Sequence, residues 1–308
     1  MTNRIKLLIA INVTLLAAVL FSLQSSRSSS TLKLGQQNFT LEDTSGVEKI
    51  VLGTNTLEKT GPQEWEVNGN YQVQPSRMQS LLAVLGRLQI KRPVPEASLD
   101  SVNNLLQNAD FSVEIYDGEE NLVKTYSLAG KGDETYAKLA SEDEPYILYI
   151  PGYFVNIYEL FNINEQAWRD KRVLYTTWRT LQSLEIDYTG DTENDLDIKF
   201  DSSFYKVARV ERLDSAKLYT YIQQYQNFEV DAYVQNAENL KQTLSETPPF
   251  CVVLLNDLYE SRNNSLMVYP NDSTVYGIIE KSGELVRMNR NMLRNYLVSR
   301  EEFEKPSE

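Results

Sequence analysis

The sequence contains no histidine and a single cysteine, Cys251, among its 308 residues. Without histidine the chain has no Ser-His-Asp triad, no Cys-His pair and no imidazole metal site. One cysteine forms neither an intrachain disulfide nor a thiolate zinc site. We therefore expect no metal and no cofactor.

Basic residues are also few. Lys and Arg number 30 against 43 Asp and Glu, which gives a formal net charge of −13. Phosphate binding needs a basic surface, so we predict no nucleic-acid partner. Glycine (13) and proline (10) are sparse as well, which excludes a collagen-like or low-complexity chain. The length suits about two domains of ~150 residues each.

The one long uncharged apolar run lies at the N-terminus, where residues 7–23 read LLIAINVTLLAAVLFSL after Arg4 and Lys6. Seventeen helical residues span about 25 Å, close to the ~30 Å core of a bilayer. Basic residues before such a run place the N-terminus in the cytoplasm. We predict an anchor over residues 1–23, single-pass in the inner membrane, with the bulk of the chain periplasmic. Its apolar residues include Leu7, Leu8, Ile9, Leu15, Leu16, Val19, Leu20 and Phe21.

A cleaved signal peptide is the alternative to an anchor, and a buried soluble helix is a second one. The apolar run exceeds the usual ~7–15 residues of a signal peptide, and no A-x-A site follows it, so the anchor is favoured. Residues 24–36 begin with a Ser-rich stretch and predict a short flexible tether.

An internal repeat becomes visible when the chain is shifted by 140 positions. Trp65 then falls on Tyr205, and Val67 on Val207. The apolar positions of one helical face also coincide: Met78, Leu81, Leu82, Leu85 and Leu88 fall on Leu218, Tyr221, Ile222, Tyr225 and Phe228. Further along, a one-residue shift brings Phe111, Val113 and Ile115 near Phe250, Val252 and Leu254. We infer a tandem duplication; the alternative is two unrelated stretches with a common pattern.

Helical and alternating apolar patterns are interleaved in both halves, which predicts an α+β fold with mainly antiparallel sheets. We expect helices near residues 76–88, 99–107, 154–161, 215–228, 237–245 and 290–298, with Ser76 as an N-cap. In the first half, strands are expected near residues 48–52, 56–59, 64–67, 112–116, 122–128, 135–139 and 146–150. The predicted repeats cover residues 37–172 and 173–303, followed by a tail at 304–308.

The order of these segments resembles a known bacterial family. It comprises Trp-x-Val at residues 65–67, the helix MQSLLAVLGRLQIKRPV, the hairpins KTYSLAGKGDETYAKLASEDEPYILYI, and then AWRDKRV. This is similar to domain-of-unknown-function family 4340, in the short, N-terminally anchored form of Bacteroidota. The resemblance implies an envelope protein with repeated α+β modules, whose relatives accompany auxiliary proteins of gliding-type ABC transporters. It implies no catalytic residues. The second half departs from the pattern, with Tyr205-Lys206-Val207 in place of Trp-x-Val.

The strongest candidate site is the basic cluster at the junction of the halves: Trp168, Arg169, Asp170, Lys171 and Arg172. It is the one strongly basic stretch of an acidic chain. We interpret it as a brace between the domains, or alternatively as a docking patch for an acidic partner.

Four further stretches have weaker functional interpretations. The acidic segment DTENDLDIKFD from Asp191 lacks the Gly and Glu of a calcium loop and is interpreted as a loop. AGKGDET at residues 129–135 lacks phosphate-loop spacing and predicts a hairpin turn. Trp65 and Trp178 suit core packing better than sugar stacking. Cys251 lies in the apolar PFCVVLL and is expected to be a buried small hydrophobe.

These observations favour a membrane-anchored scaffold or accessory protein that acts by protein–protein interaction and is no enzyme. Its expected partners are integral membrane proteins, with an ABC-transporter assembly as the class that the resemblance implies, and the lipid bilayer through its anchor. A glycan- or peptidoglycan-binding module with a cleft between the repeats is the alternative. A glycoside hydrolase built on two carboxylates is more remote, because nothing selects a pair among 43 acids.

Overall fold

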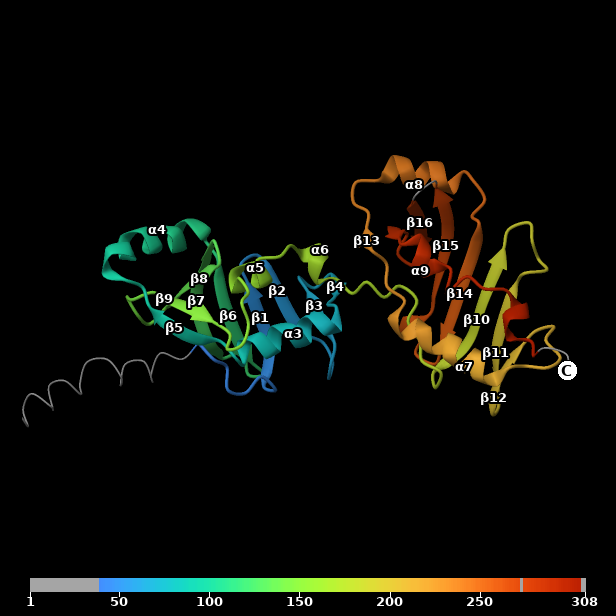
Figure 1. The fold of residues 1–308 in the computed structure, drawn as a ribbon, viewed down its shortest axis with the longest axis horizontal. Helices are drawn as coiled ribbons and strands as arrows, with labels where there is room; N and C mark the ends of the chain where they lie inside the picture. The colour runs from blue at the N-terminus through green and yellow to red at the C-terminus, as the bar shows by residue number, and fades with distance from the viewer. Residues whose placement is uncertain (1–38, 272–273, 306–308) are drawn as a thin grey trace, which may run out of the picture. The chain divides into compact units, whose positions relative to one another are not determined.

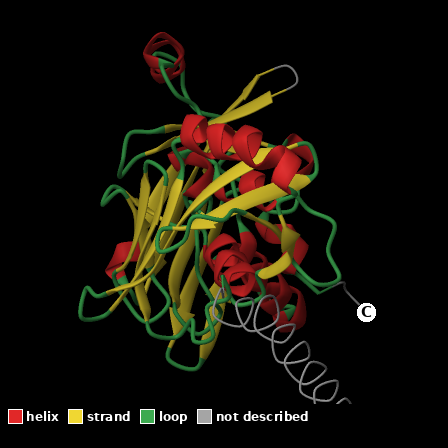
Figure 2. Cartoon of the chain, turned by 90° about the vertical axis from the view of Figure 1, so that its left-hand side faces the viewer, coloured by secondary structure: helices red, strands yellow, loops and turns green. Residues whose placement is uncertain are grey.

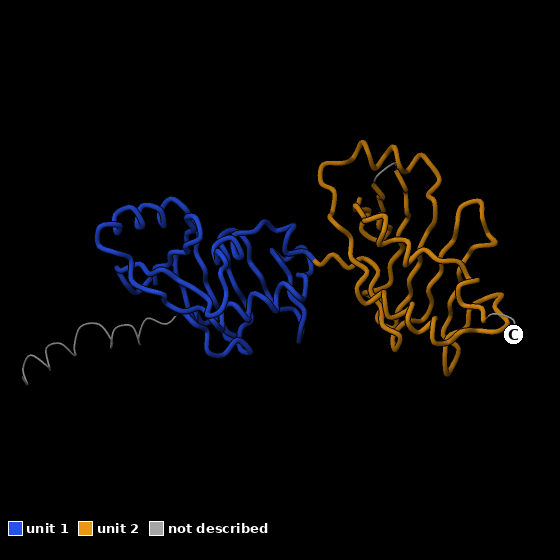
Figure 3. Tube along the Cα trace, in the orientation of Figure 1, with its two compact units in different colours: residues 1–169 blue, residues 170–308 orange. Residues whose placement is uncertain are grey.

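The computed structural model describes residues 39–271 and 274–305. The chain divides into two compact units, residues 1–169 (unit 1) and 170–308 (unit 2) (Figure 3). The predicted boundary was 172/173. The predicted anchor and tether, residues 1–36, lie outside the described residues. Across 39–271 and 274–305, the helices are too short or too polar to cross a bilayer.

Unit 1 contains a nine-stranded sheet in the order β4-β3-β2-β1-β6-β7-β8-β9-β5 (Figure 1). All the pairings between these strands are antiparallel. The strands are β1 (Val47–Leu52), β2 (Asn55–Lys59), β3 (Trp65–Val67), β4 (Tyr71–Gln72), β5 (Gln89–Pro93), β6 (Ser112–Asp117), β7 (Leu122–Lys131), β8 (Glu134–Leu139) and β9 (Tyr146–Tyr149). The helices are α3 (Pro75–Leu85), η1 (Glu96–Ser98), α4 (Leu99–Ala109), α5 (Ile157–Phe161) and α6 (Glu165–Trp168).

Both faces of this sheet are covered. Consecutive strand residues point to opposite faces, and on β7 Leu128 belongs to the large core while Ala129 belongs to a smaller one. Helix α3 contributes Met78 to the large core. Helix α4 contributes Val102 to the smaller core, on the other side of the sheet. Figure 2 separates the helices, in red, from the strands, in yellow.

Unit 2 contains an eight-stranded sheet in the order β12-β11-β10-β14-β15-β16-β17-β13, again with antiparallel pairings. The strands are β10 (Leu181–Tyr188), β11 (Leu196–Asp201), β12 (Phe204–Val207), β13 (Ala232–Tyr233), β14 (Cys251–Asp257), β15 (Asn264–Asn271), β16 (Thr274–Ile279) and β17 (Leu285–Met288). The helices are α7 (Ser215–Gln224), η2 (Tyr225–Asn227), α8 (Glu238–Ser245), η3 (Glu260–Arg262), α9 (Arg290–Leu293) and η4 (Arg300–Phe303).

The unit 2 sheet is covered on both faces in the same way. Val268 on β15 packs in the large core together with Leu218 of α7. Its neighbour Tyr269 packs on the opposite face, where Leu240 and Leu244 of α8 lie. Spacing of four residues puts these two leucines on one side of α8, so this short helix is attached by a single apolar stripe.

The two sheets share their strand order, apart from the additional β4 in unit 1. Two of their hairpins also share a register. In β7–β8 the pairs run from Tyr126↔Leu139 to Lys131↔Glu134. In β15–β16 they run from Leu266↔Ile279 to Asn271↔Thr274, with every residue 140 positions later. Positions in the two hairpins can therefore be compared residue by residue.

The prediction of an α+β fold with mainly antiparallel sheets is confirmed, while two details of the sequence analysis are wrong. Pairs of β6–β7 and β14–β15 match at the offset of 140, for example Ser112↔Ser127 and Val252↔Met267. Phe111 therefore corresponds to Cys251, not to Phe250. Helix α3 begins at Pro75 after Gln74, so Ser76 is not its N-cap. Proline suits the first helical position because its missing N–H is not needed there.

Substitution of Tyr126 and of Tyr221 tests how hydrogen bonding of a buried hydroxyl affects stability. Both hydroxyls are buried, but that of Tyr126 has no hydrogen-bond partner among the described residues. The Tyr221 hydroxyl donates to the Tyr296 carbonyl at 2.6 Å. We expect Tyr126→Phe to raise the free energy of unfolding by about 1 kcal/mol, and Tyr221→Phe to lower it by about 1 kcal/mol. Urea denaturation checks both, and equal destabilisation by the two variants would contradict the assignment.

Candidate functional site

The predicted basic cluster is divided between the two units. Trp168 is buried in the core of unit 1. Arg169 is buried as well: its guanidinium lies 3.6 Å from the centre of the Tyr71 ring and donates to the Gln166 side chain at 3.0 Å. These two residues secure the end of unit 1. The interpretation of the whole cluster as an interdomain brace stays a prediction.

The remaining members of the cluster begin unit 2. Lys171 donates from Nζ to the Asp231 carbonyl at 2.8 Å. Arg172 donates from Nε to both carboxylate oxygens of Asp170 at 3.0 Å. Burial opposes the charge of Arg172, but the hydrogen bond and charge of Asp170 outweigh it and raise the pKa of the guanidinium. Arg172 therefore stays positively charged at any physiological pH.

Arg172 is the first of four side chains that stack on one another. Its guanidinium lies 4.4 Å from the centre of the Tyr175 ring, and that of Arg262 lies 4.7 Å from the same ring. Arg262 also lies 4.6 Å from the ring of Tyr259. We call these four residues the arginine–tyrosine stack. Each such contact contributes about 0.5–1 kcal/mol at an exposed site, and more where water is excluded.

Asp257, at the end of β14, holds the stack in place. Its carboxylate is fully buried and accepts hydrogen bonds from the hydroxyls of Thr176 (2.6 Å) and Thr180 (2.7 Å). The other carboxylate oxygen accepts from the Tyr259 backbone N–H at 2.9 Å. Arg262 approaches that oxygen to 3.7 Å. One buried acid thus attaches the segment after the unit boundary to the β14–β15 connection.

The connection itself differs from its counterpart in unit 1. After Asp257 the chain forms η3, and Asn264 donates from its amide to the Val173 carbonyl at 2.9 Å. The counterpart between β6 and β7 is a tight turn, in which Asp117 accepts from the backbone N–H groups of Glu119 and Asn121 at 2.9 Å. Beside the stack, Leu258 and Tyr259 are more than half exposed. Unit 2 therefore presents aromatic, apolar and arginine side chains where unit 1 has an acidic turn.

The other predicted stretches have no clustered ligands. The Asp195 carboxylate accepts from the Tyr188 backbone N–H at 2.9 Å, and Asp197 accepts from Lys199 at 3.0 Å. Burial and the nearby Asp195, Glu185 and Asp197 raise the pKa of Asp187. Within residues 39–271 and 274–305, no three acidic or cysteine side chains are grouped as a metal site would require.

The two candidate sugar-stacking tryptophans have different environments. Trp65 begins β3 and is buried in the unit 1 core. Trp178 is 36% exposed, and its ring meets that of Tyr219 edge-on at 5.7 Å. An edge-on pair is a poor flat platform for a sugar ring. Residues 129–135 form the end of the β7–β8 hairpin, as predicted.

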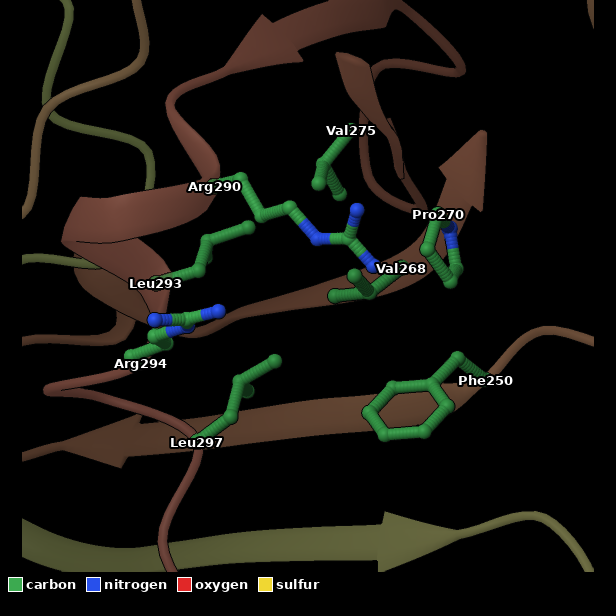
Figure 4. Close-up of a pocket in the computed structure, with 8 residues that line it drawn as sticks. All are labelled: Phe250, Val268, Pro270, Val275, Arg290, Leu293, Arg294 and Leu297. Atoms are coloured by element: carbon green, nitrogen blue, oxygen red, sulfur yellow. The ribbon is translucent and has the colours of Figure 1, made fainter. Parts of the chain in front are cut away.

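A pocket of about 280 Å³ lies in unit 2 between α9 and the β15–β16 hairpin (Figure 4). No pattern in the sequence predicts this pocket. Arg290 and Arg294 are four residues apart in a predicted helix, which indicates two arginines on one face of it. This spacing does not indicate the pocket beside them. The lining residues are Phe250, Val268, Pro270, Val275, Arg290, Leu293, Arg294 and Leu297.

Comparison with known proteins identifies a family. The model of a domain of unknown function, DUF4340, matches residues 65–247, which is more than half of the chain. The chain belongs to the DUF4340 family. No curated protein and no solved structure matches it. The DUF4340 match begins at Trp65, crosses the unit boundary with Arg172 and Tyr175, and ends before Tyr259, Arg262 and the pocket.

Asp257 offers a test of how the stack is held. We expect Asp257→Ala in this DUF4340 protein to lower the free energy of unfolding of unit 2 by about 3 kcal/mol, because two threonine hydroxyls lose a charged, buried acceptor. Glu280→Ala, at an exposed acid of the same unit, is the control and should change little. Urea denaturation measures both. Equal effects would mean that Asp257 does not organise this region.

Cys251 offers a test of burial. Desolvation raises the pKa of its thiol from 9.0 to about 12. The thiol ionises near pH 9 in the unfolded chain and near pH 12 in the folded one. The neutral thiol therefore contributes its full stability below pH 9, and this contribution is lost as pH rises toward 12. From pH 9 to 10.5 the unfolding free energy should fall by about 1.5 kcal/mol more than in Cys251→Ala. Denaturation at the two pH values measures the difference. Rapid alkylation of the folded protein at pH 8.5 would contradict burial.

Proposed function

We propose that this protein is a membrane-anchored extracytoplasmic scaffold that docks an integral membrane protein through the arginine–tyrosine stack of unit 2. The stack and its exposed neighbour Leu258 carry the proposal. Tyrosine and arginine are enriched among the residues that dominate protein–protein binding energy. An ABC-transporter-type membrane assembly is the class of partner that the family resemblance implies.

The stack is preorganised for binding. Immobilising a long side chain at an interface costs about 0.5–1.5 kcal/mol. Here each arginine already lies against a tyrosine ring, and the buried Asp257 fixes the loop that carries Tyr259 and Arg262. A partner would therefore gain contact area without ordering these side chains. Acidic groups on the partner would complement the guanidinium edges, which suits a basic patch on an acidic chain.

The anchor and the duplication complete the proposal. The basic start and the apolar residues 7–23 support attachment to the inner membrane with the units on the periplasmic side. The shared strand order and the hairpin register at an offset of 140 support two copies of one module. In this proposal unit 2 acquired the docking loop after duplication, because the corresponding turn in unit 1 is short and acidic.

The docking surface can be tested by cross-linking in the native membrane. The full-length protein is cross-linked mildly, extracted in detergent and recovered with its partners. We expect integral membrane proteins to be recovered, and Tyr259→Ala and Arg262→Ala each to reduce recovery about tenfold, the effect of losing about 1.4 kcal/mol at a hot spot.

The matched controls are Tyr219→Ala and Arg287→Gln, which alter an exposed tyrosine and an exposed arginine of unit 2 outside the stack. Both should recover partners like the unaltered protein. Equal recovery from all four variants would refute the stack as the docking surface. Recovery of glycan without protein partners would instead favour the glycan-binding function, for which the partly exposed Trp178 would be the first residue to test.

A further inference from the structure

The pocket of unit 2 has an apolar floor and a cationic rim. Val268, Val275 and Leu293 are buried and form its base, while Arg290 and Arg294 are exposed. Figure 4 shows the side chain of Arg290 extending over the pocket toward the β15–β16 hairpin, with Arg294 beside Leu293 and Leu297. The guanidinium groups are thus placed where the apolar surface meets water.

The same place in unit 1 is filled. By hairpin register, Pro270 and Val275 correspond to Gly130 and Thr135. A Cβ atom on Gly130 would lie 2.7 Å from the Tyr158 ring, so that ring sits directly over the strand. The hydroxyl of Thr135 accepts the backbone N–H groups of Ile157 and Tyr158 and draws α5 onto the hairpin. Val275 cannot accept such bonds, and proline replaces glycine where the ring would lie.

The rim selects a negatively charged ligand. Among the described residues the guanidinium of Arg294 makes neither a hydrogen bond nor an ion pair, so it can receive an anion. Arg290 lies four residues earlier on the same side of the pocket. Arginine binds carboxylates through paired hydrogen bonds that are stronger than neutral ones. The chain as a whole is acidic, so two arginines at one hollow form a local exception to its charge.

The floor selects a short apolar chain. A volume of about 280 Å³ is just below the range of roughly 300–1,000 Å³ for ligand pockets. At about 30 Å³ per non-hydrogen atom, the share of one water in the liquid, it holds roughly nine atoms. The lining comes from β15, β16 and the segments beside them, which are inner strands of the sheet, whereas its edges are β12 and β13. An extended peptide would find no unpaired strand edge here, which favours a small amphiphile.

We propose that this pocket binds the acyl chain of a medium-chain carboxylic acid, with the carboxylate held by Arg290 and Arg294. The inference is independent of the docking function proposed above. A chain of about eight carbons would lie on Val268, Val275 and Leu293, and its carboxylate would emerge at the rim.

The test is photolabelling of the full-length protein, kept in solution by an amphipathic polymer. The probe is octanoic acid with a photoreactive diazirine in its chain, and the competitors are octanoate, butyrate and octanol. We expect saturable labelling of peptides that contain the pocket residues. Octanoate should compete, while butyrate should be much weaker, since each buried methylene contributes about threefold to fourfold in affinity. Octanol should be roughly tenfold weaker because it lacks the charge.

Arg294→Gln and Arg290→Gln should each weaken octanoate competition roughly tenfold. Arg287→Gln, the same change at an exposed arginine outside the pocket, should bind like the unaltered protein, and thermal unfolding shows whether the three variants are folded alike. Tyr259→Ala should retain octanoate binding, which separates this site from the docking surface. Equal competition by octanol and octanoate, equal binding by the three glutamine variants, or labelling away from the pocket would each overturn the proposal.

Discussion

The pairing of β1 with β6, and of β10 with β14 in unit 2, is the contact on which each unit depends. Each sheet consists of two meanders that meet at this pair, with β5 or β13 added at the outer edge of the second meander. The central pair alone joins the meanders. The chain between them must leave the sheet and return, so it contains the helices that cover the two faces. Closing such non-local pairs costs loop entropy, which the apolar surfaces buried on both faces offset.

The two units share their sheets and differ in the connections between the strands. The sheets agree in order, and two hairpins agree in register, whereas the connections at the sheet ends do not. In unit 1 a tight acidic turn follows β6, and Tyr158 closes the space over the β7–β8 hairpin. In unit 2 the corresponding places hold the arginine–tyrosine stack and the pocket. The side chains that could bind a partner or a ligand are thus concentrated in unit 2, although both units have the same strand order.

Local patterns in the sequence predict most of the elements, because alternation and helical spacing are properties of neighbouring residues. The helix expected at 99–107 is found at Leu99–Ala109. The helix expected at 76–88 ends at Leu85, and after it residues 89–93 pair with β9 as an edge strand. The helix expected at 290–298 is much shorter. The pairing of residues 89–93 with β9 joins segments that are distant in the sequence, which periodicity does not reveal.

The candidate sites are harder to predict from the sequence, because each combines residues that are far apart in the chain. Arg172 was identified because it lies in a basic run. Its companion Arg262 lies 90 positions later in an ordinary loop, and the two meet only through the ring of Tyr175. The pocket exists because the two hairpins differ at corresponding positions. Thr135 accepts backbone N–H groups at the start of α5, whereas Val275, at the same position in the β15–β16 hairpin, cannot.

The common hairpin register also bears on how the chain assembles during synthesis. Unit 1 leaves the ribosome first, and tandem units with the same strand order are prone to exchange strands in partly folded states. Replacement of a β7 or β8 strand by its counterpart from unit 2 would keep the backbone pairing. The exchange of β7 would, however, bring Pro270 to the place of Gly130 beneath Tyr158, and the exchange of β8 would bring Val275 to the place of Thr135. The difference between the two hairpins at these few positions therefore disfavours a hybrid sheet, so that each nascent unit pairs with its own strands.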